Sequence, residues 1–244
     1  MKKLSDAQIE AFDTEYVDED RWTLIKGRID ADFPDGDFSF LDLGGGSGRF
    51  ADRLLSNYPR AVGSVLDNSE VLLGRNQQNE RKEIICGSVA DLTKMTKKYD
   101  LVCMHWLLHH LIGDSYAGTR RNQLNTLKTL ALLLARRGRV SVFENNYAGW
   151  LVNDLPGRLI YLVTASKAVA TVSRRMGANT AGVGVCFLSK KEWSETIKEA
   201  GLTVLDYGEP DAWQWPLRWE WKVFLHVGNV RAGHYWLGVT SAQA

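Results

Sequence analysis

The segment from Gly44 to Gly48 reads Gly-Gly-Gly-Ser-Gly, directly after the apolar run from Phe38 to Leu43 and directly before a stretch with helical periodicity. Glycine loses more conformational freedom on folding than any other residue, so a cluster of ordered glycines needs a reason. Glycines let the main chain come close to a ligand, and the N–H groups that open the following helix can bind a carboxylate or a phosphate. The segment therefore predicts a ligand-binding turn between a strand and a helix.

Short apolar runs alternate with helical patterns between residues 38 and 146. We expect strands at 38–43, 61–66, 83–86, 101–104 and 140–143, and helices at 48–56, 69–78 and 120–137. This alternation indicates a parallel, doubly wound α/β sheet, because each parallel pair of strands needs a crossover connection. In such a sheet the ligand lies beyond the carboxyl ends of the strands, which is where the glycine cluster falls.

The last third of the chain contains one helix that is delimited at both ends. Ser189 and Glu192 have the spacing of a capping box, and Gly201 is placed to end the helix. Strands are expected at 202–206, 221–227 and 235–239. More than forty residues separate the fifth strand from this helix, which is too long for an ordinary loop and predicts an inserted cap.

Composition excludes some classes of function. The chain has 244 residues, with 30 Lys and Arg against 29 Asp and Glu, whereas a dedicated nucleic-acid binder is clearly basic. The three cysteines are far apart in apolar contexts, so we expect buried free thiols rather than a disulfide or metal framework. No signal peptide and no apolar run long enough for a membrane span is evident, which predicts a cytoplasmic protein.

A carboxylate lies nineteen residues after the last glycine of the cluster. Asp67 ends the second expected strand, where it can accept hydrogen bonds from both ribose hydroxyls of an adenosine. A dinucleotide fingerprint is disfavoured only mildly, because Gly46, Gly48 and Ala51 fit its G-x-G-x-x-A variant. A P-loop is excluded, since the cluster has no lysine that could reach a phosphate.

These motifs resemble those of one family. Asp42-Leu-Gly-Gly-Gly-Ser-Gly48 is similar to the D-x-G-x-G-x-G motif of the class I S-adenosylmethionine-dependent methyltransferases of small-molecule type, and residues 86–92 and 99–111 resemble the segments that follow the third strand and form the fourth strand in that family. The resemblance covers residues 38–146 and 187–206. It implies a Rossmann-like, doubly wound, mostly parallel seven-stranded sheet with helices on both faces and a helical cap insertion.

The resemblance also implies the cofactor and its contacts. S-adenosylmethionine is the expected methyl donor and S-adenosylhomocysteine its product, held by Asp42, Gly44, Gly45, Gly46, Gly48, Asp67, Asn68, Ser88, Val89, Met104, His105 and Tyr16. Ser88 departs from the family, which often has an acid at this position. No metal site is predicted: His105 and His109 have the spacing of a metal pair, but no acidic or cysteine ligand accompanies them.

Three side chains are candidates for catalysis. Glu144 follows the fifth expected strand, where the substrate should arrive, although a helix cap or a solvated strand end is an equally good interpretation. His109 and His110 lie just past the fourth strand. Because neighbouring residues on a helix point about 100° apart, at most one of these two histidines should face the pocket.

Two further segments allow more than one interpretation. The insertion around residues 147–191 is apolar and locally basic, which suits an apolar or anionic acceptor or contact with a membrane surface, but a helical cap that buries its face on the domain is the first interpretation. A tryptophan-rich stretch is expected to be a strand at the sheet edge or an aromatic wall for the acceptor; its members are Trp213, Trp215, Trp219 and Trp221.

We therefore predict one methyltransferase domain over residues 1–244, divided into an N-terminal helical lid (1–36), a cofactor-binding core (37–146), an inserted cap (147–188) and a C-terminal helix with strands (189–244). The expected reaction is in-line transfer of a methyl group to O, N or C of a small molecule, such as a natural product or a lipid-like compound. Two alternatives stay open: a non-catalytic cofactor-binding regulator, and a methyltransferase acting on protein or nucleic acid.

Overall fold

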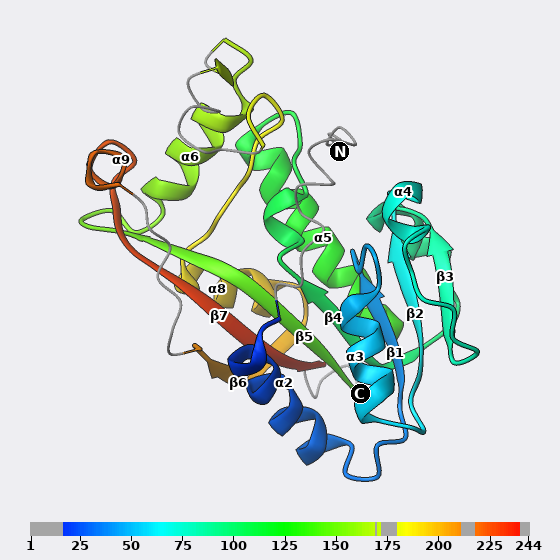
Figure 1. Cartoon of the computed structure of the whole chain (residues 1–244). Coiled ribbons are helices and arrows are strands. Elements are labelled where there is room, and N and C mark those ends of the chain that lie inside the picture. Colours follow the sequence, from blue (N-terminus) through cyan, green and yellow to red (C-terminus); the bar gives the residue numbers. More distant parts are fainter. Residues whose placement is uncertain (1–16, 169, 172–179, 211–217, 240–244) are drawn as a thin grey trace.

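The computed structural model describes residues 17–168, 170–171, 180–210 and 218–239, and it contains one seven-stranded sheet (Figure 1). The strands lie in the order β3-β2-β1-β4-β5-β7-β6. In chain order the elements are α2 (Glu19–Asp32), β1 (Ser39–Leu43), α3 (Arg49–Asn57), β2 (Val62–Asp67), α4 (Glu70–Leu73), β3 (Lys82–Cys86), η1 (Val89–Lys94), β4 (Tyr99–His105), η2 (Leu108–His110), α5 (Tyr116–Leu133), β5 (Leu134–Gly149), α6 (Leu155–Ala165), α8 (Lys190–Glu199), β6 (Leu202–Gly208), α9 (Trp219–Phe224) and β7 (Val227–Val239).

Strands β1 to β5 are mutually parallel, and β7 runs antiparallel to both β5 and β6. The strand order reverses beside β1, because the chain moves outward from β1 to β2 and β3 and then returns to β4 on the other side. The turns after β1 and β4 therefore diverge and leave room for a ligand at the carboxyl edge. The predicted doubly wound, mostly parallel seven-stranded sheet is confirmed.

Helices cover both faces of the sheet (Figure 1). On one face, Ile25 of α2 and Leu54 of α3 are fully buried in a cluster that includes Phe40 of β1. On the other face, Leu127 of α5 and Trp193 of α8 pack in the second large cluster. Both faces are buried, which is why the central strands read as nearly continuous apolar runs in the sequence.

The capping signals at the C-terminal helix are confirmed. The Ser189 side chain accepts from the N–H of Glu192, and the Glu192 carboxylate accepts from the backbone N–H of Ser189 in return. Gly201 follows the helix with a left-handed φ of 81°, a conformation that glycine adopts without strain. These local signals fix both ends of α8 before any tertiary contact is considered.

One predicted helix is too long, and one predicted strand is wrong. The helix expected at 69–78 ends at Leu73, because Gly74 closes its last turn and the Asn76 side chain donates to the Leu73 carbonyl. The strand expected at 221–227 is instead α9 followed by the start of β7. Trp221 and Leu225, four residues apart, pack into one apolar cluster and are joined by a backbone hydrogen bond of 2.8 Å, which favours a helical turn over a strand.

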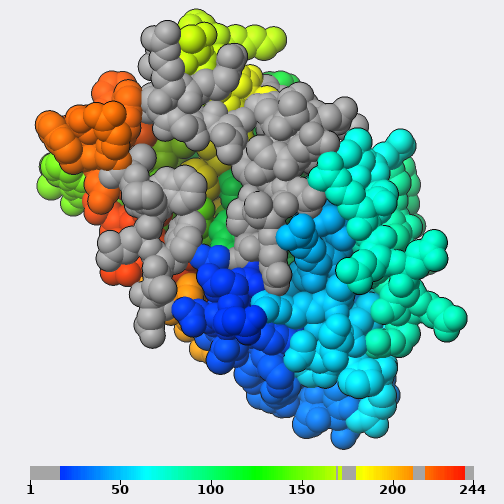
Figure 2. Space-filling view, in the orientation of Figure 1, coloured from blue at the N-terminus to red at the C-terminus, as the bar shows by residue number. Residues whose placement is uncertain are grey.

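Strand β5 is much longer than the four residues expected. Its second half pairs with β7 in antiparallel register, out to Gly149 opposite Val227, so residues 147–149 of the predicted cap belong to the sheet. Helix α6 follows, and Ile160 buries its apolar face against Tyr147 and Val230. Within the described residues, this part of the predicted cap packs on the domain. Helix α9 projects at the outer end of the β5–β7 pair (Figure 2), where Trp219 and Phe224 are exposed.

The structure also bears on the predicted N-terminal lid, the cysteines and the membrane-spanning segment. Helix α2 packs on the sheet through Ile25 and Ile29, so the second half of the predicted lid is part of the core, whereas Tyr16 lies outside the described residues, as do Trp213 and Trp215. Cys103 and Cys186 are buried free thiols, but Cys86 is exposed, because it ends the edge strand β3. Among the residues that the structure describes, no helix is long and apolar enough to cross a membrane.

Candidate active site

The glycine turn between β1 and α3 needs its glycines. Gly44, Gly46 and Gly48 have φ values of 74°, 51° and 75°, in the left-handed region that other residues avoid. Gly45 has an ordinary φ but no space, since a Cβ atom there would lie 2.4 Å from Oδ2 of Asp42. The side chain of Asn76 also holds the turn, because its Nδ2 donates to the carbonyl of Gly46 at 2.8 Å.

Asp67 lies across this turn at the end of β2. Its carboxylate accepts from the backbone N–H of Gly46 at 3.1 Å and from that of Ser69 at 2.9 Å. Burial raises the pKa of this carboxyl group, and the backbone N–H donors oppose that shift. Each carboxylate oxygen keeps a second lone pair, so the group can still accept from a ribose hydroxyl. The predicted role of Asp67 stays a prediction that its position supports.

Asp42 is the most unusual group near the turn. It is buried, and its Oδ2 has no hydrogen-bond partner among the described residues. Burial, followed by the nearby charge of Asp67, raises the pKa of Asp42 to about 7. An unpaired carboxylate oxygen in a buried site fits a cationic ligand group such as the ammonium of a bound amino acid. The glycine turn and Asp42 together thus fit the methionine end of S-adenosylmethionine.

The residues predicted for the adenine side are less uniform. The Ser88 hydroxyl donates to Asp91 at 2.9 Å within the cap of η1, so its proton is already used and its oxygen can only accept from a ligand. Asp91 was not found from the sequence, although it supplies an acid beside the position where the family often has one. Val89 is half-buried and Asn68 is exposed, whereas the Met104 side chain is fully buried in the core, which leaves only its main chain for a ligand.

Glu144 and His109 form a close pair beyond the carboxyl ends of β4 and β5. Oε2 of Glu144 lies 2.6 Å from Nδ1 of His109, and Oε1 accepts from the backbone N–H of Leu108 at 2.8 Å. The Glu144 side chain is fully buried, and His109 is 5% exposed. The sequence analysis named both residues as candidates for catalysis, but it did not predict that they are in contact. They meet because η2 folds Leu108 and His109 back over the end of β5.

His110 takes a different position from its neighbour. Its ring centroid lies 4.1 Å from that of His109, which is the histidine that contacts Glu144. Burial and the adjacent His109 hold the pKa of His110 well below its usual range. The expectation that at most one of the two histidines faces the pocket stays a prediction, and His109 is the one that contacts Glu144.

Two aromatic rings lie beside His109, and one of them, Tyr147, is buried. The Phe187 ring lies 4.7 Å from the His109 ring, and Tyr147 stacks on Phe187 at 4.4 Å with an interplanar angle of 16°. Tyr147 comes from the end of β5, and Phe187 comes from the segment that leads back to α8. Neither was singled out as an aromatic contact from the sequence, because their pairing joins positions forty residues apart.

A second buried polar group lies on the opposite face of the same strands, and sequence reasoning missed it. Nε2 of His105 lies 2.9 Å from Oγ of Ser141, which in turn lies 2.7 Å from Nε2 of His234. Burial lowers the pKa of His105 to about 3. Only His105 carried a sequence signal, as a predicted main-chain contact to the cofactor.

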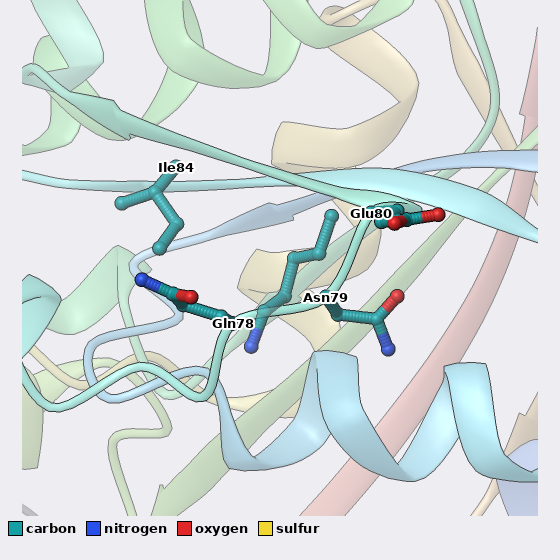
Figure 3. Close-up of a pocket in the computed structure, with 5 residues that line it drawn as sticks. Gln78, Asn79, Glu80 and Ile84 are labelled. Atoms are coloured by element: carbon teal, nitrogen blue, oxygen red, sulfur yellow. The ribbon is translucent and has the colours of Figure 1, made fainter.

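One surface hollow of about 420 Å³ lies beside the outer strand β3 (Figure 3). It is lined by Gln78, Asn79, Glu80, Lys82 and Ile84. None of these residues is a predicted cofactor or catalytic residue. The hollow therefore adds nothing to the site at the carboxyl edge of the sheet.

The sheet with one reversed strand, the glycine turn after β1 and the carboxylates that end the neighbouring strands together define the class I methyltransferase fold. A family model described as a methyltransferase domain matches residues 40–129. The chain therefore carries a methyltransferase domain in this stretch, which covers less than half of its 244 residues. None of the curated proteins matches the sequence significantly.

Three solved structures illustrate the likeness of fold. The mitomycin 7-O-methyltransferase MmcR is 16% identical with a TM-score of 0.56, over 90% of this chain and 55% of that one. CalO1, a methyltransferase in calicheamicin biosynthesis, is 18% identical with a TM-score of 0.53, over 97% and 59%. The N-methyltransferase NodS from Bradyrhizobium japonicum WM9 is 12% identical with a TM-score of 0.55, over 92% and 99%. The chain thus spans a little over half the length of the first two.

Proposed function

We propose that the protein transfers a methyl group from S-adenosylmethionine to a hydroxyl oxygen of a small molecule, with His109 as the general base. The observation that carries this proposal is the 2.6 Å contact between Nδ1 of His109 and Oε2 of Glu144. When bound, S-adenosylmethionine supplies a methyl group that is already activated on a sulfonium. What the protein must add is orientation, exclusion of water and removal of the hydroxyl proton.

The contact with Glu144 orients the imidazole of His109. An ionised carboxylate only accepts hydrogen bonds, so the proton of a neutral His109 resides on Nδ1 and the lone pair on Nε2. That lone pair can take the proton of an acceptor hydroxyl, and the negative charge of Glu144 then stabilises the imidazolium that forms. Leu108 fixes the other carboxylate oxygen through its backbone N–H. We therefore assign Glu144 a positioning role rather than the role of the base.

The neighbourhood of His109 supports an aromatic acceptor. The half-buried Phe187 ring lies beside it and stacks on the buried Tyr147 ring, and a flat apolar ligand gains most from contact with such a ring. An anionic acceptor has less support, because Arg158 of α6 pairs with Asp154 at 2.7 Å instead of standing free. The acceptor class that we propose is a phenol or a related hydroxylated natural product. The activity that names MmcR, a 7-O-methyltransferase, is compatible with this class.

The proposal includes the compartment and the remaining partners. Cys86, Cys103 and Cys186 are free thiols, which supports a reducing compartment and hence the cytoplasm. We propose a free small molecule as the acceptor, because the balanced charge of the chain does not suit a nucleic acid.

Two measurements test the proposal. Isothermal titration with S-adenosylhomocysteine measures the cofactor site, and transfer of a labelled methyl group to a panel of phenols, alcohols and amines measures the reaction. We expect binding together with products methylated on oxygen. Binding without transfer to any member of a broad panel would contradict an enzyme, and transfer confined to amines would contradict the hydroxyl assignment.

A further inference from the structure

A continuous line of polar side chains crosses the interior from α2 to the end of β4. Nη1 of Arg28 bonds to Nδ1 of His234, whose Nε2 lies 2.7 Å from Oγ of Ser141. Oγ of Ser141 lies 2.9 Å from Nε2 of His105. At the outer end, Nε of Arg28 donates to Asp206 at 2.7 Å. His234 and Ser141 are fully buried, so this arrangement is shielded from water.

The sheet register explains why these residues meet. Ser141 of β5 lies opposite Cys103 of β4, two residues before His105, so Ser141 and His105 are diagonal neighbours on one face. Phe143, two residues after Ser141, lies opposite His234 of β7. All of these side chains point toward the face that α2 covers. Arg28 closes the line because it lies on the buried side of that helix.

The direction of each hydrogen bond follows from the chemistry at the Arg28 end. A guanidinium has only donors, so Nδ1 of His234 must accept. Burial and the charge of Arg28 hold the pKa of His234 well below its usual range, so the ring is neutral and its proton is on Nε2. That proton is donated to Ser141, whose own hydroxyl proton is then directed to Nε2 of His105. A neutral His105 must carry its proton on Nδ1.

Nδ1 of His105 is the end of the line, and the His105 ring lies beside the first turn of the helix that follows the glycine turn. The His105 ring lies 4.6 Å from the ring of Phe50, which belongs to the first turn of α3, two residues after Gly48. Within the part of the chain that the structure describes, no group accepts a hydrogen bond from Nδ1 of His105. The ring is half-buried rather than sealed in the core. It therefore offers an oriented donor beside the ligand-binding turn.

We propose that Arg28, His234 and Ser141 fix His105 as the Nδ1–H tautomer, and that this N–H donates to the carboxylate of the methionine part of the bound methyl donor. The carboxylate is the group of that ligand that needs donors, whereas the ammonium is served by the unpaired oxygen of Asp42. The choice of ligand rests on the proposed function, but the tautomer does not. His105 acts on the ligand, and the other three are positioning residues.

The tautomer can be measured in the full chain without any ligand. Nitrogen-15 NMR of the histidine rings should show His105 with a protonated Nδ1 and an unprotonated Nε2 at neutral pH. Ser141→Ala removes the donor to Nε2 and should give a mixture of both tautomers. Ser64→Ala is the matched control, because Ser64 is an equally buried serine on β2 that contacts Glu83 and Tyr99 instead. Finding the Nε2–H tautomer in the wild-type protein would overturn the proposal.

The ligand contact is tested by isothermal titration with two probes. His105→Phe should weaken binding of S-adenosylhomocysteine by about 10-fold or more, as for a lost hydrogen bond to a charged group. It should leave 5′-methylthioadenosine, which lacks the carboxylate, within 2-fold of the wild-type value. His105→Asn should restore most of the loss, because its side-chain amide places a donor near the position of Nδ1.

The outcomes separate this proposal from the proposed function. If the wild-type protein binds neither probe, the proposed function is wrong. If it binds S-adenosylhomocysteine and His105→Phe binds it equally well, or if both probes weaken together, the carboxylate contact is wrong while the proposed function stands. Circular dichroism and the unfolding midpoint of each variant show whether it is folded.

Discussion

His109 and His105 lie only four residues apart, yet they belong to two networks, in which the nearest charged group is a carboxylate for His109 and a guanidinium for His105. His109 turns toward the face that carries α5 and contacts the carboxylate of Glu144 through Nδ1. His105 turns toward the face that carries α2 and connects through two buried side chains to the guanidinium of Arg28. The same imidazole is therefore oriented by an anion in one network and by a cation in the other.

This difference sets what each histidine can do. A carboxylate fixes the proton on Nδ1, leaves a lone pair on Nε2 and stabilises the protonated ring, which suits a general base. In the other network burial lowers the pKa of both His105 and His234 and keeps these rings neutral, and the guanidinium of Arg28 sets the direction of the hydrogen bonds between them. The first network suits proton transfer and the second suits binding.

The largest effect is expected from His109→Gln. If His109 is the general base, its loss should lower kcat by about 10²- to 10⁴-fold with the acceptor identified in the transfer assay. The affinity for S-adenosylhomocysteine should stay within 2-fold of the wild-type value, because the residues proposed to bind the cofactor are unchanged. The adjacent His110→Gln variant is the control, and its kcat should fall by less than 10-fold. Equal losses in the two variants would remove the distinction between these histidines.

Glu144→Gln breaks the same network at its anionic end. The variant keeps an acceptor for the Leu108 N–H but removes the charge that orients and stabilises His109. We expect a fall of about 10- to 10³-fold in kcat, smaller than that for His109→Gln. Glu192→Gln serves as the control, since this carboxylate caps α8 and should affect stability rather than turnover. A turnover unchanged in Glu144→Gln would contradict the positioning role.

The cationic network should appear in the pH dependence of stability. Burial lowers the pKa of His105 to about 3, against about 6.5 in an unfolded chain. Below pH 6.5 the unfolded state binds a proton that the folded state does not, so the free energy of unfolding should fall as the pH decreases. We expect a loss of about 2 kcal/mol between pH 6.5 and 4.5, measured by urea unfolding. His105→Asn should reduce this slope, and an identical slope would refute a buried neutral His105.

Local signals in the sequence predicted most of the fold. The capping box at Ser189 and Glu192 and the glycines with left-handed φ specify their own conformations, so their prediction needed no tertiary information. The strand expected at 221–227 is wrong because Trp221 packs with Leu225, four residues further on, which a helical turn places on the same face. The length of β5 depends on a partner strand eighty residues further along the chain, which no local pattern reports.

The site divides in the same way. The glycine turn and Asp67 follow a fixed spacing along the chain and were found from the sequence. His109 and Glu144 were found as separate candidates, because each follows a strand, but their contact depends on how η2 folds back. Ser141, His234 and Arg28 come from three different elements and have no shared spacing. Such residues become visible only when the register of the sheet is known.

A pair of buried carboxylates gives the last and smallest prediction. Glu144 has hydrogen bonds to both oxygens, whereas Oδ2 of Asp42 has none among the described residues, and the pKa of Asp42 is raised to about 7. If Asp42 holds the ligand ammonium, it must be ionised in the complex, so binding below pH 7 releases a proton. The Kd for S-adenosylhomocysteine should therefore rise by about 10-fold from pH 8 to pH 6, and Asp42→Asn should flatten this profile. Titrations at pH 6.5 in two buffers of different ionisation enthalpy should detect the released proton, and a flat wild-type profile would exclude Asp42 as the ammonium partner.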